Sequence, residues 1–301
     1  MPRPDPTPLV LAPRRVTGSG AALALASAAA ALLFLAGAVP LYAQSGGNAP
    51  VEALAKALSL RDVVEVMHQE GIAYGADLEA EMFEGQGGQS WTAAVEGIYS
   101  MDRIYPMIEA RFAAELVERK ADVPAMVAFF DGETGRKAVA LEISARRAML
   151  DEAVEDAARV KLDELRADED PRIAAVEAYV EANNLVEENV SSGLNASLAF
   201  YRGLAEAGAF GEGFSDEDML SDVWSQEAEI RAETEEWLYG FLVMAYAPMT
   251  DAELDAYTEF SRTDAGQDLN AALFAGFGDM FTDVSERLGR TAATYIVGSD
   301  L

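Results

Sequence analysis

Residues 250–267 read TDAELDAYTEFSRTDAGQ, and this stretch decides the fold. Thr250 and Glu253 have the spacing of a capping box, in which a hydroxyl and a carboxylate satisfy the free backbone N–H groups that open a helix. Phe260 follows after one short helix, and a polar turn leads to Gly266. Apolar residues then recur at helical spacing towards the C-terminus. The stretch therefore predicts a short helix, a sharp corner and a long helix.

A similar pattern lies 131 residues earlier in the chain. Phe129 aligns with Phe260 and Gly135 with Gly266, so each copy places a glycine six residues after an aromatic residue. In both copies an acid-headed short helix comes before the aromatic and a long helix follows the glycine. Agreement in spacing and in helix pattern is typical of an internal duplication. We therefore expect two related helical halves.

The stretch from Thr250 to Gln267 resembles the hallmark of an uncharacterised bacterial family known as domain of unknown function 2059. That hallmark is a helix starting Thr-x-x-Glu-Leu, an aromatic, a polar turn, a glycine and a long helix. Residues 123–136 resemble a degenerate first copy, which departs from the usual turn at Pro124 and at Phe129 and Phe130. The resemblance covers the end of the chain well and the first half poorly. It implies an exported helical protein and attaches no activity to it.

Both turns are expected to act as structural corners. The aromatics Phe129 and Phe260 end a short helix where the chain reverses, and we predict that both are buried beneath their turns. A small residue at Gly135 or Gly266 would let the new helix approach its neighbour closely. Phe260→Ala is expected to lower the melting temperature markedly, and Gly266→Ala is expected to cost far less if Gly266 is already helical. The turns also hold polar side chains that can accept from the first N–H groups of the new helix, namely Asp131, Thr134, Thr263 and Asp264.

The rest of the chain predicts an all-α fold, because apolar residues recur every three or four positions and no stretch alternates as a strand would. We expect a helix from near Trp91 to Glu118 that breaks at Pro106, and one long helix from Thr134 to just before Asp168. Aromatic residues at helical spacing in the second half are expected in the core: Trp237, Phe241, Phe274, Phe277 and Phe281.

The N-terminus predicts export. Arg14 and Arg15 precede an apolar run from Ala21 to Val39, and a short proline-containing segment leads to Ala43. This order is typical of a bacterial signal peptide over residues 1–43. The general secretory path is favoured, and the paired arginines leave the twin-arginine path open. Because the run is nearly long enough to span a bilayer, an uncleaved inner-membrane anchor stays an alternative to release into the periplasm.

Three parts follow from these patterns. Residues 1–43 form the signal peptide or anchor, 44–174 a first helical half with the degenerate repeat, and 175–301 a second half with the family-like repeat. Half of all residues are apolar, which is enough for a packed bundle-like body.

The formal net charge is −30. It becomes more negative without the N-terminal segment, which holds Arg3, Arg14 and Arg15 against Asp5. Such a surface repels phosphate, so neither nucleic acid nor direct binding to anionic lipid is expected. Basic partners and loosely held divalent cations stay open. Cysteine is absent, which excludes disulfides, thiol catalysis, thiolate metal sites and lipid attachment through cysteine.

No catalytic constellation emerges from the motifs. His68 is the only histidine and has no second ligand to join it in a metal site. Residues 88–92 begin like a nucleophile elbow but end in threonine and lack a preceding strand. The acids between 227 and 236 fall mostly off the apolar face, which is typical of a solvated surface. We therefore expect no catalytic, cofactor or metal residue. The residues of note are structural: Phe129, Gly135, Thr250, Glu253, Phe260 and Gly266.

Three functions remain open on the sequence. The first is a non-enzymatic envelope protein that binds another envelope protein through helix surfaces. The second is a carrier of an apolar ligand, which requires an apolar cavity connected to solvent. The third is a peptidoglycan hydrolase with one protonated glutamate, which requires a buried glutamate in a long cleft. The sequence leaves the partner and the oligomeric state open.

Overall fold

The computed structural model describes residues 49–83, 85–210 and 215–298. Throughout these ranges the regular elements are helices and no strand occurs, which confirms the all-α prediction. The expected signal peptide or anchor over residues 1–43 lies outside the described residues. Within the described part, no helix has both the length and the apolarity needed to cross a membrane.

The helices that precede residue 150 are α2 (Ala49–Ala57), α3 (Leu60–Phe83), α4 (Gly88–Ile98), α5 (Met101–Arg119), α6 (Val123–Phe130) and α7 (Glu133–Ala148). Those that follow are α8 (Glu152–Ala167), α9 (Pro171–Ala182), α10 (Leu185–Glu206), α11 (Asp216–Ser225), α12 (Glu227–Tyr246), α13 (Asp251–Ser261) and α14 (Asp264–Gly298).

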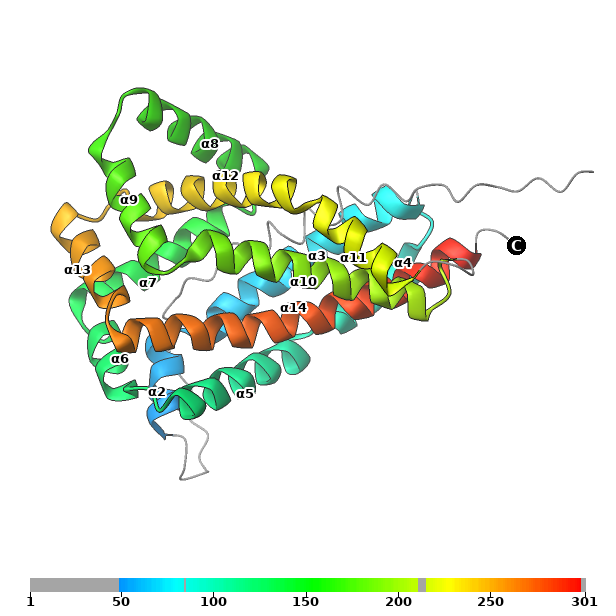
Figure 1. Cartoon of the computed structure of the whole chain (residues 1–301), viewed down its shortest axis with the longest axis horizontal. Helices are drawn as coiled ribbons and strands as arrows, with labels where there is room; N and C mark the ends of the chain where they lie inside the picture. The colour runs from blue at the N-terminus through cyan, green and yellow to red at the C-terminus, as the bar shows by residue number, and fades with distance from the viewer. Residues whose placement is uncertain (1–48, 84, 211–214, 299–301) are drawn as a thin grey trace, which may run out of the picture.

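A row of helices sets the shape of the body. In the order α5, α14, α10, α12 and α8, each helix packs against the next, and Figure 1 shows them stacked across the long axis of the molecule, from α5 at the bottom to α8 at the top. Helix α14 crosses α10 very closely, because a Cβ at Gly203 would overlap the backbone of Glu286. Helix α8 lies at the outer end of the row and contacts mainly α12.

The aromatic residues expected in the core are buried, with one exception. Phe241, Phe274, Phe277 and Phe281 are all closed to solvent within the main apolar cluster. Trp237 is only half-buried, although it stacks on Phe241 with ring centroids 5.2 Å apart. Its exposed part lines a pocket between α8 and α12.

Two expected helix boundaries are wrong. The predicted break at Pro106 is absent: α4 ends at Ile98, and Pro106 lies inside α5. Because α5 begins at Met101, the N–H that proline lacks would have bonded to a carbonyl in the first turn, so only one helical bond is lost. The break falls instead at Ser100, whose ψ of 136° is extended.

The single long helix expected from Thr134 to Asp168 is two helices, α7 and α8. The chain turns between Met149 and Asp151. The side chain of Asp151 accepts from the backbone N–H of Ala153 at 3.0 Å and so opens a new helix. This Asx-type cap competes with continued helix, and periodicity alone does not reveal it.

Candidate functional site

The two corners have the same backbone geometry. In the first, the N–H of Gly132 donates to the carbonyl of Phe129 at 2.9 Å; in the second, the N–H of Thr263 donates to the carbonyl of Phe260 at 3.0 Å. The short helices α6 and α13 each pack on the long helix that follows them, and each also packs on the long helix of the other corner. The corners therefore interlock.

The motif aromatics meet each other at this junction. Phe129 and Phe260 stack with ring centroids 4.0 Å apart and an angle of 9° between the ring planes. Both rings are half-buried and not fully buried, so the prediction that each is buried beneath its own turn is wrong. Each ring covers the other across the interface between corners. The fully buried aromatic is the neighbouring Phe130.

The motif glycines have matching surroundings. A Cβ on Gly135 would overlap the carbonyl oxygen of Phe129 and lie 2.6 Å from the Cα of Phe130. A Cβ on Gly266 would overlap the carbonyl oxygen of Phe260 and lie 2.7 Å from the Cα of Ser261. The expected close approach is confirmed. The expectation that alanine at Gly266 would cost far less than alanine at Phe260 is not supported, because a rigid backbone occupies the space the methyl group needs.

Capping differs between the corners. The expected capping box of Thr250 and Glu253 is confirmed: Thr250 accepts from the N–H of Glu253 at 3.3 Å, and Glu253 accepts from the N–H of Thr250 at 2.7 Å. Thr263 also caps α14 as expected, accepting from the N–H of Gly266 at 3.0 Å. The first corner lacks an equivalent cap, because α7 starts after Gly132, which has no side chain to offer. The expected caps from Asp131 and Thr134 are therefore absent there.

A buried polar cluster lies on α7, and it was not expected from the sequence. Glu142 is 0% exposed and accepts from the hydroxyl of Tyr246 at 2.7 Å. Arg146, 1% exposed, binds Glu70 through two nitrogens at 2.6 and 2.7 Å. Burial, followed by the Glu142 carboxylate, raises the pKa of Tyr246 well above its ordinary value. These groups fix the register of α7 against α3 and α12.

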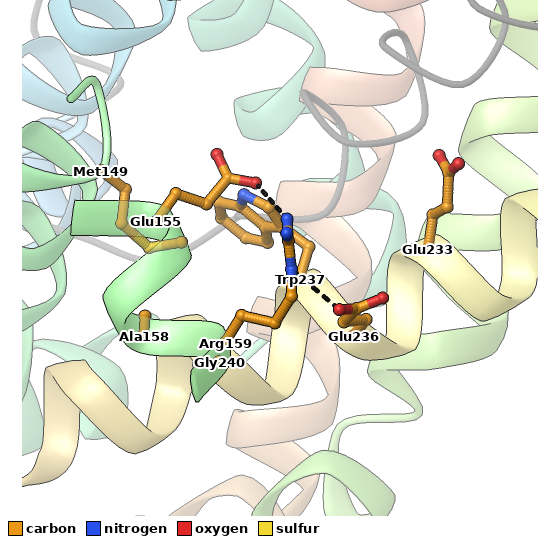
Figure 2. A pocket seen from close by; sticks show the side chains of 8 residues that line it. All are labelled: Met149, Glu155, Ala158, Arg159, Glu233, Glu236, Trp237 and Gly240. Carbon is orange, nitrogen blue, oxygen red and sulfur yellow. Dashed lines mark hydrogen bonds and ion pairs between the residues drawn. The ribbon is translucent and has the colours of Figure 1, made fainter. Parts of the chain in front are cut away.

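A pocket with a volume of about 380 Å³ lies between α8 and α12. Its apolar wall consists of the Trp237 ring with Met149, Ala158 and Gly240, and its charged residues are Glu155, Arg159, Glu233 and Glu236. Figure 2 shows Glu155, Arg159 and Glu236 gathered near the Trp237 ring, with Glu233 standing apart on α12. The pocket combines an aromatic surface with an excess of negative charge.

The charges in this pocket are unevenly paired. Arg159 binds Glu236 at 2.8 Å, Asp156 at 3.1 Å and Glu155 at 3.5 Å. Burial raises the pKa of Glu155 despite the nearby Arg159. Burial also raises the pKa of Glu233, and the carboxylates of Glu229 and Glu236 raise it further. One guanidinium is therefore shared among several carboxylates.

A second pocket, of about 20 Å³, lies under the corners and has room for about one water molecule. Its lining includes Phe260, Gly266 and Tyr257. His68 makes a hydrogen bond between its Nδ1 and the carbonyl of Tyr99 at 2.9 Å, in keeping with a structural role. Within the described ranges, no cluster of three or more His, Cys, Asp or Glu side chains is arranged to hold a metal ion.

Comparisons with protein-family models, with curated proteins and with solved structures found no match for this chain. The α8–α12 pocket offers carboxylates and an aromatic ring. From the sequence, Trp237 was expected in the core and the acids of α12 on a solvated surface. Only the position of α8, which packs over this part of α12, brings them into one pocket.

Proposed function

We propose that the chain is an exported, non-enzymatic protein of the bacterial periplasm that binds another envelope protein at the pocket between α8 and α12. The pocket is the observation that carries this proposal. It is large enough for a side chain of a partner, and α8, at the outer end of the helix row, forms one wall. A half-buried tryptophan beside unpaired charge is typical of an interface residue and atypical of a core.

The two alternative functions receive less support. A carrier of an apolar ligand needs an apolar cavity, whereas the larger pocket is lined by four charged side chains and the aromatic one holds about 20 Å³. A glutamate-dependent hydrolase needs its acid in a cleft. The fully buried Glu142 is engaged by Tyr246 and is not among the residues that line either pocket. Glu155 and Glu233 do line the larger pocket and have raised pKa values, but both are only partly buried.

The proposal includes an internal duplication and membership of the uncharacterised exported family that the second corner resembles. The interlocked corners support the duplication. Helix α6 packs on α14, the long helix of the other corner, and α13 packs on α7 in the same way. Further pairs correspond in the same order, since α2 packs on α6 as α9 packs on α13, and α3 on α4 as α10 on α11. Helix α8 falls between the two sets. The proposed binding pocket thus lies where the two halves differ.

Site-specific photo-crosslinking in cells tests the binding proposal. A photoreactive residue replaces Val160, which is 59% exposed and follows Arg159 on α8. The matched control replaces Val117 on α5, which is 69% exposed and lies at the other end of the helix row. We expect one defined envelope-protein adduct from position 160 and none from position 117, with the same pair recovered when the partner is tagged. The same adducts from both positions, or none from either, would refute binding at the pocket.

The proposed export to the periplasm is tested separately. Protein released by osmotic shock is expected to begin at Gln44 when its N-terminus is sequenced. Recovery of an intact N-terminus in the membrane fraction would instead support the anchor.

A further inference from the structure

The lining of the α8–α12 pocket is unbalanced in charge. The lining includes three carboxylates, those of Glu155, Glu233 and Glu236, and one guanidinium, that of Arg159. Arg159 is already engaged by Glu155 and Glu236, the contacts drawn in Figure 2. Glu233 stands apart in the same view, and among the described residues no ion pair to it is found. The pocket therefore retains a carboxylate that no cation in the described part of this chain neutralises.

The aromatic wall lies on the same helix as this carboxylate. Trp237 follows Glu233 by one helical turn, so the two side chains point to the same side of α12. Phe241 covers one face of the indole, with ring planes 10° apart. A cation is attracted to the face of an indole and to a carboxylate at once. Met149 and Ala158 complete an apolar wall that suits the methylene stem of a long side chain.

We propose that the occupant of this pocket is a lysine or arginine side chain of the bound protein, with its cation at Glu233 and its stem along Trp237. This inference rests on the proposed protein-binding function and names the chemistry of the partner. A metal ion suits the site less well, because within the described part of the chain no three ligands converge. An anionic partner would meet a protein with a net charge of −30.

Burial and the acids nearby oppose ionisation of Glu233, which raises its pKa. An arriving cation reverses this effect, so binding stabilises the carboxylate that attracts it. The groups that bear on Glu233 are Glu229 and Glu236 on its own helix, and Glu155 and Arg159 on α8. Affinity is therefore expected to fall as pH decreases towards the raised pKa, and as salt screens the charges.

The test uses protein purified from cells that express the full chain and two peptides, acetyl-Gly-Lys-Gly-amide and the same peptide with neutral norleucine for lysine. The chain has three tryptophans, so a ¹⁵N spectrum shows three indole signals, and the Trp237→Phe variant identifies one of them. We expect the lysine peptide to shift the Trp237 signal and leave those of Trp91 and Trp224 unchanged. The norleucine peptide is expected to shift none.

Glu233→Gln is expected to lower the affinity for the lysine peptide by about fivefold, which is the effect of losing one partly screened ion pair. Its matched control, Glu235→Gln, removes the same charge from the same helix outside the pocket lining and is expected to leave affinity unchanged. Equal weakening by both variants would reduce the effect to general attraction by an acidic surface and overturn the inference. An equal response to norleucine would overturn it as well. Tighter binding of putrescine than of the peptide would assign the site to a small amine and also overturn it.

Failure of this inference and failure of the proposed function are distinguishable. A crosslink at position 160 without a response to the lysine peptide would support the proposed binding surface and exclude a basic side chain as its occupant. A response to the peptide without a crosslinked partner would support the cation site and exclude the proposed protein-binding function.

Discussion

Phe129 lies flat against Phe260, with ring centroids 4.0 Å apart, although the two residues are 131 positions apart in the chain. Each ring ends a short helix, and each short helix packs on both long helices. The stacked pair therefore joins the two corners at their most similar point. Loss of either ring should loosen both corners together.

A double-mutant cycle measures this coupling. Phe129→Ala and Phe260→Ala are each expected to lower the free energy of unfolding by about 1.5–3 kcal/mol, because each ring is only partly buried. The double variant should lose less than the sum of the two, by about 1 kcal/mol, which is the energy typical of an aromatic pair. Urea unfolding gives all four free energies. Strict additivity would show that the rings stabilise the two corners independently.

The motif glycines are expected to be intolerant of alanine. Gly266→Ala places a methyl group against the backbone of Phe260 and Ser261, and we expect a loss of about 1–3 kcal/mol from overpacking. Gly278 on the same helix has open space where a Cβ would lie, so Gly278→Ala should stabilise by up to about 1 kcal/mol through helix propensity. Thermal melts of the two variants should shift in opposite directions. A shared direction would mean that propensity and not packing decides at Gly266.

Much of this fold can be predicted from local sequence signals. The capping boxes at Thr250 and Ser215 and the spacing of apolar residues are sufficient to predict an all-α chain, because both depend on neighbours within one helical turn. The Phe129–Phe260 stack could not be predicted in this way, since it forms only after two distant segments fold against each other. Local signals also predicted a helix break at Pro106, which the structure does not have. Proline is tolerated there because α5 begins shortly before it, at Met101.

The sites were less accessible to sequence reasoning than the fold. In α7 the buried positions recur with the helical period, and Glu142 and Arg146 fall on that face among alanine and valine. A charged residue that interrupts an apolar face is a usable signal, but it was hidden in a chain rich in acids. The pocket at Trp237 gave no such signal, because one of its walls comes from α8 and depends on where that helix packs.

The buried carboxylate predicts a specific dependence on tyrosine. Tyr246→Phe removes the hydroxyl that donates to Glu142 at 2.7 Å in a fully buried setting. We expect a loss of about 1–3 kcal/mol in the free energy of unfolding, because a buried acceptor loses a donor that water does not replace. Tyr239→Phe is the matched control on the same helix, since Tyr239 is half-buried and stacks with Arg166 at 5.5 Å. An equally small effect of both changes would mean that Glu142 obtains its stabilisation elsewhere.

The capping box predicts a pH dependence of stability. Hydrogen bonds from Lys137 on α7, and then from the backbone and hydroxyl of Thr250, lower the pKa of Glu253 to about 2. Because the folded-state pKa is below the value of 4.5 for an unperturbed glutamate, Glu253 stabilises the protein above that value, and the contribution is lost as pH falls from about 4.5 towards 2. Glu253→Gln should therefore lower the melting temperature at pH 7, and the difference from the unchanged protein should shrink as the pH is lowered below 4.5. Glu259→Gln, an exposed change on the same helix, should show a much smaller difference at pH 7. If the difference in melting temperature between Glu253→Gln and the unchanged protein stays constant from pH 7 to pH 3, the carboxylate charge contributes nothing to the cap.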